Sequence, residues 1–107
     1  MNKINREKIS QLVFNCISKY QVEYDQIIDL SEGEQTRLFG GSGQLDSLGL
    51  VSLVVNIEED IETELGISLI LADEKAMSRR TSPFSRIVNL IDYINELVLN
   101  QSENNQL

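Results

Sequence analysis

The chain has 107 residues, of which 41% are hydrophobic, and this length supports one compact core and therefore a single domain. Its formal net charge at pH 7 is −8, from 17 acidic and 9 basic residues. This balance argues against binding to nucleic acid or to anionic membrane surfaces, because phosphate groups attract the opposite charge.

An amphipathic helix is predicted over residues 3–20. Apolar residues recur there at steps of three and four, which is the spacing of a helix face packed on a core. Since Cys16 lies on this face, we expect it to be a buried structural thiol rather than a reactive one. The complete apolar face comprises Ile9, Leu12, Val13, Cys16, Ile17 and Tyr20.

Residues 21–46 form a long connection that is polar and glycine-rich and has no steady apolar period. We expect a loop with room for one short helical turn. Connections of this length in a compact domain are uncommon, and they are often functional or packed across the core. Leu38 and Phe39 are the residues expected to fix this loop to the core.

A second helix is predicted to start at Asp46, whose side chain can cap it, and to stop at Gly66. Its core face would comprise Leu50, Val54, Ile57, Ile61 and Leu65.

A short third helix is predicted over residues 73–77, and Ser82 followed by Pro83 is a start signal for the last helix. Residues 99–107 have little to bury, so we expect a disordered tail after a domain of residues 1–98. The fold class is therefore all-α, with three principal helices. The core face of the last helix comprises Ile87, Leu90, Ile91, Ile94, Leu97 and Val98.

The single cysteine excludes an internal disulfide, and no charge-flanked apolar run near the N-terminus resembles a signal peptide. We therefore expect a cytoplasmic protein. No stretch approaches the roughly 20 apolar residues of a membrane span.

Ser47 opens the second predicted helix directly after the glycine-rich stretch "LFGGSGQLD". A phosphate-binding P-loop is excluded because the lysine and the preceding strand are missing, and the dinucleotide fingerprint lacks its third glycine. A nucleophilic serine usually needs a neighbouring histidine, and the chain has none. A Ser–Lys pair stays open by composition, although Lys19 and Lys75 have no apolar setting. The plain alternative is that Asp46 caps a helix and Ser47 is its first residue.

The residues around this serine resemble the acyl carrier protein family, whose signature is Asp-Ser-Leu at the start of the second helix of a small acidic bundle. The matching residues are Asp46, Ser47 and Leu48, followed by "GLVSLVVNIEEDI". The resemblance continues weakly through "ISL" to "SPFSRIVNLIDYI", and so covers most of the chain from Leu38 to Leu97. It implies a four-helix bundle with a short third helix and a long loop between the first two.

By this resemblance Ser47 is an attachment point and not a catalyst. A separate phosphopantetheinyl transferase, using coenzyme A and Mg²⁺, would add 4′-phosphopantetheine to its hydroxyl. Asp46 would cap the helix and help the transferase to hold its metal and substrate. The protein would be a monomeric, non-enzymatic acyl carrier without a metal site of its own. Its further partners would be an acyl- or aminoacyl-adenylating ligase, an acyltransferase or a ketosynthase.

Leu48, Val51 and Val55 recur at helical spacing beside the predicted core face, and in the family such residues form an exposed docking patch. The alternative is that they belong to the core. Acidic residues crowd the end of the same helix, which is the unfavourable end of the helix dipole. A charge run is usually only a solvated face, but we expect recognition by basic partners here. The acidic docking residues would be Glu58, Glu59, Asp60 and Glu62.

Two features depart from the family pattern. Gly49 and Ser52 stand where carriers of primary fatty-acid synthesis often have acidic residues, and "LADEKAMSRRTSPF" is longer and more basic than the usual third-helix region. Both favour a dedicated carrier in a smaller fatty-acid, polyketide or other biosynthetic pathway. An aminoacyl or peptidyl carrier, loaded by an adenylating enzyme, is one alternative. An unmodified helical adaptor is another, from a different class of protein.

Overall fold

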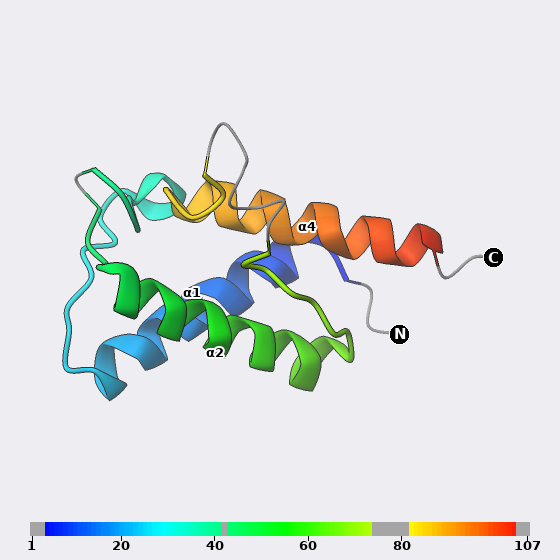
Figure 1. Cartoon of the computed structure of the whole chain (residues 1–107), viewed down its shortest axis with the longest axis horizontal. Coiled ribbons are helices and arrows are strands. Elements are labelled where there is room, and N and C mark those ends of the chain that lie inside the picture. The colour runs from blue at the N-terminus through cyan, green and yellow to red at the C-terminus, as the bar shows by residue number, and fades with distance from the viewer. Residues whose placement is uncertain (1–3, 42, 74–81, 105–107) are drawn as a thin grey trace.

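The computed structural model describes residues 4–41, 43–73 and 82–104. Within these ranges the chain forms helices α1 (Arg6–Glu23), α2 (Ser47–Leu65) and α4 (Ile87–Asn104), a 3₁₀ turn η1 (Gly33–Gln35), and no strand (Figure 1). The all-α prediction is therefore confirmed for the described part of the chain. The predicted short helix over residues 73–77 lies, apart from Asp73, outside the described residues.

Helix α1 begins and ends later than the sequence predicted. Asn5 caps it, because the Asn5 side-chain oxygen accepts a hydrogen bond of 2.9 Å from the Lys8 amide. The predicted apolar face is confirmed in full, and Cys16 within it is a buried free thiol.

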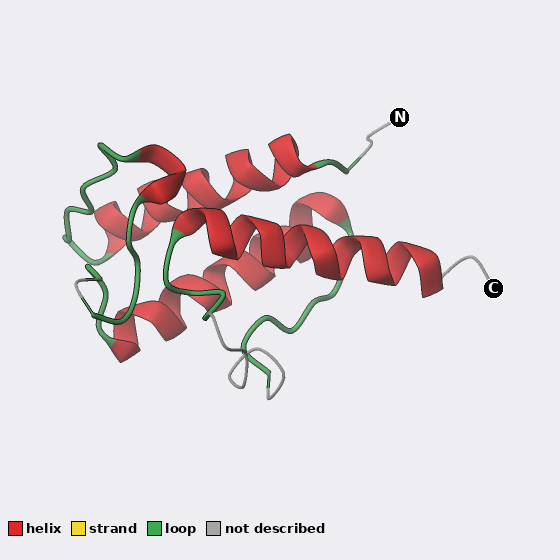
Figure 2. Cartoon of the chain, turned by 90° about the horizontal axis from the view of Figure 1, so that it is seen from above, coloured by secondary structure: helices red, strands yellow, loops and turns green. Residues whose placement is uncertain are grey.

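Helix α1 is the central element of the bundle, because it packs against both α2 and α4. The start of α1 and the end of α4 lie at one end of the molecule, whereas α2 starts at the other (Figure 1). The long connection between α1 and α2 also lies at the end where α2 starts, as a second view shows (Figure 2). The centre of the core is formed by side chains of all three helices, among them Ile17, Leu53, Ile57, Leu90 and Ile94.

Gln44 is one of the side chains that fix the long connection. Its amide nitrogen donates to the carbonyls of Asp29 (3.1 Å) and Arg37 (3.3 Å), and its oxygen accepts from the Asp29 amide (2.7 Å). Leu38 is completely buried, as predicted, and Phe39 is partly buried against the core. The connection is thus packed across the bundle, and it fixes the position of the start of α2.

The predicted start of the last helix is wrong. Ser82 and Pro83 form a turn in which the Phe84 amide donates to the Ser82 hydroxyl. The chain then pairs with the long connection, since the Leu38 amide donates to the Ser85 carbonyl at 2.7 Å. Because of this pairing, the chain is not helical before Ile87.

Helix α4 extends into the segment predicted to be a tail and continues to Asn104. Residues 105–107 lie outside the described residues, and the disorder of residues 99–107 stays a prediction. Each residue added to a helix that has already formed gains a backbone hydrogen bond without a further nucleation cost. Val98 is buried, and the Gln101 side-chain amide lies 3.5 Å from the Ser68 carbonyl, so this part of α4 still contacts the domain.

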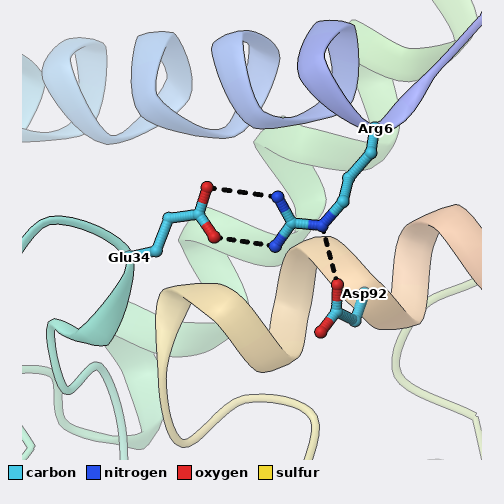
Figure 3. Close-up of polar contacts among 3 residues, drawn as sticks. All are labelled: Arg6, Glu34 and Asp92. Atoms are coloured by element: carbon cyan, nitrogen blue, oxygen red, sulfur yellow. Dashed lines mark hydrogen bonds and ion pairs between the residues drawn. The ribbon is translucent and has the colours of Figure 1, made fainter.

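An ion-pair cluster around Arg6 joins three elements (Figure 3). The Arg6 guanidinium of α1 donates two hydrogen bonds to the Glu34 carboxylate of η1, at 2.7 and 3.2 Å, and one to Asp92 of α4 at 2.8 Å. The hydrogen bonds from Arg6 lower the pKa of Glu34 below its ordinary value. The cluster therefore ties the long connection to α1 and α4 through charge-assisted hydrogen bonds.

Candidate functional site

The start of α2 is set by Asp46. Its backbone is extended, and its carboxylate accepts a hydrogen bond of 2.7 Å from the Gly49 amide, which makes Ser47 the first helical residue. Gly66 ends the helix in the left-handed conformation, with φ of 69°. The predicted start and end of this helix are both confirmed.

Ser47 is exposed, and so are its neighbours Asp46 and Leu48. The amides of Ser47 and Leu48 are in the first turn, where no intrahelical acceptor exists. The accessible hydroxyl therefore lies beside unpaired N–H groups and the positive end of the helix dipole, an arrangement that suits a phosphate group attached to this oxygen.

An apolar cleft of about 490 Å³ opens beside Ser47. One wall is a face of α2, and the other is formed by Ile70, Ala72 and Phe84 from the segments between α2 and α4. Phe39 of the long connection also lines it. Ser47 is therefore placed where a group attached to its oxygen has direct access to an apolar recess. The face of α2 in the cleft comprises Ser47, Leu50, Val51, Val54, Val55 and Glu58.

The three apolar residues predicted to form a docking patch are all on the surface. The exposed fraction is 78% for Leu48, 59% for Val51 and 43% for Val55. The alternative that they form the core is therefore ruled out. They do not share one depression, however, because Val51 and Val55 line the apolar cleft whereas Leu48 lines a different pocket.

The core face of α2 differs in part from the predicted one. Leu53 is completely buried although it was not assigned to that face, whereas Leu50 and Leu65 are only partly buried. The spacing of Leu53, Ile57 and Ile61 at steps of four residues was the signal that could have identified it.

Gly49 lies against α1. A Cβ atom at this position would be 2.5 Å from the Tyr20 hydroxyl and 3.2 Å from the Asp46 carboxylate. Only glycine therefore allows Tyr20 to approach the first turn of α2 this closely. The departure from the family pattern at position 49 has a packing explanation in this chain.

The acidic residues at the end of α2 divide into two groups. The half-buried Glu58 accepts a hydrogen bond of 2.8 Å from the buried Leu71 amide, and so holds the segment that follows α2. Asp60 accepts from the Cys16 thiol and from Lys19, both at 3.0 Å. By contrast, Glu59 and Glu62 are exposed. Of the four predicted docking carboxylates, two thus have structural partners within the chain.

The contacts of Asp60 also change the pKa values of Cys16 and Lys19. Burial is the main cause that raises the pKa of the Cys16 thiol, and the carboxylate beside it raises it further. Burial of Asp60 opposes its ionisation, but the hydrogen bonds from Cys16 and Lys19 prevail and lower its pKa. The Asp60 hydrogen bond raises the pKa of Lys19, which makes this lysine a poor base for Ser47.

No set of three or more His, Cys, Asp or Glu side chains in residues 4–41, 43–73 and 82–104 is arranged to hold a metal ion. In the same part of the chain, no helix has the length and apolar character needed to cross a membrane.

Sequence reasoning located the start of α2 but missed most of the surroundings of Ser47. Ile70 and Phe84 reach the cleft from segments with no regular periodicity, so only the three-dimensional arrangement identifies them. Tyr20 and Tyr24 line the pocket on the Leu48 side, and their spacing of four residues was the available signal.

Comparison with known proteins gives no match, either among family models, among curated proteins or among solved structures.

Proposed function

We propose that the chain is a stand-alone acyl carrier protein that bears 4′-phosphopantetheine on Ser47 and delivers acyl thioesters to partner enzymes. The observation that carries this proposal is the position of Ser47, an exposed hydroxyl at the first residue of a capped helix and on the rim of an apolar cleft. A plain helix start explains the cap. It does not explain the apolar recess beside an exposed serine.

The residues around Ser47 fit the proposed group. The unpaired N–H groups of the first turn can donate hydrogen bonds to its phosphodiester oxygens, while the Asp46 carboxylate accepts a hydrogen bond from the Gly49 amide. When bound, the group supplies a flexible arm with a terminal thiol for the cargo. The fixed start of α2 gives this arm a defined origin, so that one cargo can reach several active sites at high effective concentration.

The lining of the cleft supports an acyl rather than an aminoacyl cargo. Val51, Val54 and Ile70 contribute only apolar surface, and transfer of apolar surface from water is favourable. The one carboxylate in the lining, Glu58, already accepts the Leu71 amide. Burial of the ammonium group of an aminoacyl cargo in this recess would carry a desolvation cost that the apolar side chains do not offset, although Glu58 is a lining residue of opposite charge.

The decisive experiment is the intact mass of the protein after incubation with coenzyme A, Mg²⁺ and a broad-specificity phosphopantetheinyl transferase. We expect a single phosphopantetheine adduct on the wild type and none on Ser47→Ala. The variant should retain the fold, because alanine is a good helix former, and circular dichroism checks this.

Absence of an adduct on folded wild-type protein would contradict the proposal and favour the unmodified helical adaptor. If an adduct forms, the adenylating, acyltransferase or ketosynthase enzyme that loads or uses it distinguishes an acyl carrier from an aminoacyl or peptidyl carrier. Selective loading by an amino-acid-adenylating enzyme would contradict the acyl assignment alone.

A further inference from the structure

A second, smaller pocket of about 200 Å³ lies beside the start of α2. Helical geometry places its α2 residues, Leu48, Gly49 and Ser52, on a different face from those that line the apolar cleft. Ser47 lines the apolar cleft and is not among the residues that line the smaller pocket. The cleft is assigned to cargo under the proposed function, which leaves the smaller pocket without a role.

The wall opposite α2 is formed by two tyrosines in contact, one in α1 and one at its C-cap, with their rings tilted by 35°. The rings of Tyr20 and Tyr24 have centroids 4.7 Å apart. The Tyr20 hydroxyl donates to the Gln26 side-chain oxygen at 3.0 Å, and the Gln26 amide donates to the Gln44 carbonyl at 3.1 Å. The wall is therefore fixed by packing and by hydrogen bonds before any partner arrives.

The rim of the pocket exposes apolar surface from two elements. Leu48 on α2 is 78% exposed and Tyr24 at the end of α1 is 47% exposed, and both line the same depression. A large apolar side chain on each side of a preformed recess is typical of an anchor site for a partner side chain.

The charged residues on the α2 side and on the Tyr24 side of the pocket are acidic. Asp46 lines the pocket, and Glu23 and Asp25 flank Tyr24 in the sequence and are exposed, whereas Lys19, next to Tyr20, is paired with Asp60. The sequence contains no lysine or arginine in residues 20–36 or in residues 38–74. A complementary partner surface must therefore present an apolar side chain surrounded by basic residues.

We propose that this pocket, formed by Tyr20, Tyr24, Gln26, Asp46, Leu48, Gly49 and Ser52, is a docking site for the enzyme that modifies Ser47. The enzyme would insert an apolar side chain between Tyr24 and Leu48 and place lysine or arginine side chains against the acidic rim. This inference rests on the proposed function, and it extends the docking surface from α2 onto the end of α1. The modified oxygen remains accessible because Ser47 is exposed and does not line this pocket.

The test measures the steady-state kinetics of phosphopantetheinylation, with the full chain as variable substrate and a broad-specificity transferase as the probe. We expect Tyr24→Ala and Leu48→Ala each to raise KM about tenfold with little change in kcat, because they remove binding surface and leave the reacting group in place. The matched control is Leu99→Ala, which removes a 56% exposed leucine from α4, and its KM should equal that of the wild type. Tyr24→Phe keeps the ring and should restore the wild-type KM. Thermal melting of each variant verifies that the substrate is folded.

The outcomes separate this inference from the proposed function. If the wild type is not modified at all, the proposed function fails. If the wild type is modified and Tyr24→Ala has an unchanged KM, the pocket is not the docking site, whatever Leu48→Ala does. A rise in the wild-type KM with salt, lost when Asp25 is replaced by Lys, would support the acidic rim, whereas a salt-independent KM would contradict it.

Discussion

Gly49 is a residue at which two opposing effects can be compared directly. Alanine is favoured over glycine within a helix by about 1 kcal/mol. Its Cβ, however, would lie 2.5 Å from the hydroxyl of Tyr20, whose side chain is buried and hydrogen-bonded to Gln26. Since overpacking of this kind costs about 1–3 kcal/mol, we expect Gly49→Ala to lower the free energy of unfolding by roughly 1 kcal/mol net. Urea denaturation measures the change.

The matched control for Gly49→Ala removes the group that the methyl would meet. In the background of Tyr20→Phe the hydroxyl is absent, so alanine at position 49 should destabilise much less than in the wild type. A double-mutant cycle gives the coupling directly. Equal effects in the two backgrounds would show that the Tyr20 hydroxyl is not the obstacle.

Asp46 has a capping role that can be separated from any role of its charge. Asp46→Ala removes the acceptor of the Gly49 amide and should cost about 1 kcal/mol of unfolding free energy, measured by urea denaturation. Asp46→Asn keeps a side-chain oxygen and should retain most of the stability. If the charge is needed by the transferase, Asp46→Asn should still slow modification of Ser47. Full modification of Asp46→Asn at the wild-type rate would limit Asp46 to capping.

At the scale of the element, the acidic end of α2 has a carboxylate with a structural partner, Glu58, next to an exposed one, Glu59. Glu58→Ala would leave the buried Leu71 amide without an acceptor, and should cost about 1–3 kcal/mol of unfolding free energy. Glu58→Gln keeps an acceptor oxygen and should cost much less. The exposed Glu59 is the matched control, because Glu59→Ala should change stability by no more than about 0.5 kcal/mol. Thermal or urea denaturation of the three variants tests this.

Electrostatic recognition by basic partners is therefore best tested away from Glu58. We expect Glu59→Lys and Glu62→Lys to weaken partner binding at low salt and to leave the melting temperature nearly unchanged. Titration calorimetry with the transferase at two salt concentrations measures the effect. Binding that is unaffected at low salt would identify this end of α2 as a solvated face only.

The sequence predictions were correct where local interactions define the end of a helix, and wrong where a contact between distant segments defines it. The start of α2 depends on Asp46 and Gly49 and its end on Gly66, all of them local, and both were predicted correctly. The start of α4 was predicted wrongly, because it depends on a hydrogen bond from the Leu38 amide to the Ser85 carbonyl, which joins segments far apart in the sequence. The same limit applies to the site, since the motif located Ser47 and only the tertiary structure locates Phe84 and Ile70 beside it.

At the scale of the whole molecule, the Arg6 cluster links α1, η1 and α4, and its stabilising effect depends on pH. Hydrogen bonds from Arg6 lower the pKa of Glu34, and the Ser31 amide lowers that of Asp29. The unfolded chain therefore binds more protons than the folded chain in acid. This stability is fully present above the unfolded-state pKa values and is lost as pH falls through the lower, folded-state values. We expect the free energy of unfolding to decrease below about pH 4, as urea denaturation at several pH values would show.

Glu34→Gln provides the comparison for this pH dependence. At neutral pH the variant should lose about 0.5–1 kcal/mol of unfolding free energy, the contribution expected of a partly exposed bidentate ion pair. Its stability should also decline less steeply than that of the wild type as acid is added. Parallel pH profiles for the two proteins would show that the pair does not contribute to acid sensitivity.

The burial of Cys16 has a practical consequence for thiol chemistry. Its side chain is 1% exposed and its pKa is raised by burial, so almost no thiolate is available at neutral pH. We expect neither a maleimide nor a disulfide reagent to label Cys16 in the folded, unmodified protein. If Ser47 carries the proposed arm, the arm's terminal sulfur is then the only reactive thiol in the folded chain. Colorimetric thiol counting would therefore report the fraction of modified molecules without mutation of the native cysteine. Loss of this thiol signal on loading would report the fraction of molecules that carry cargo.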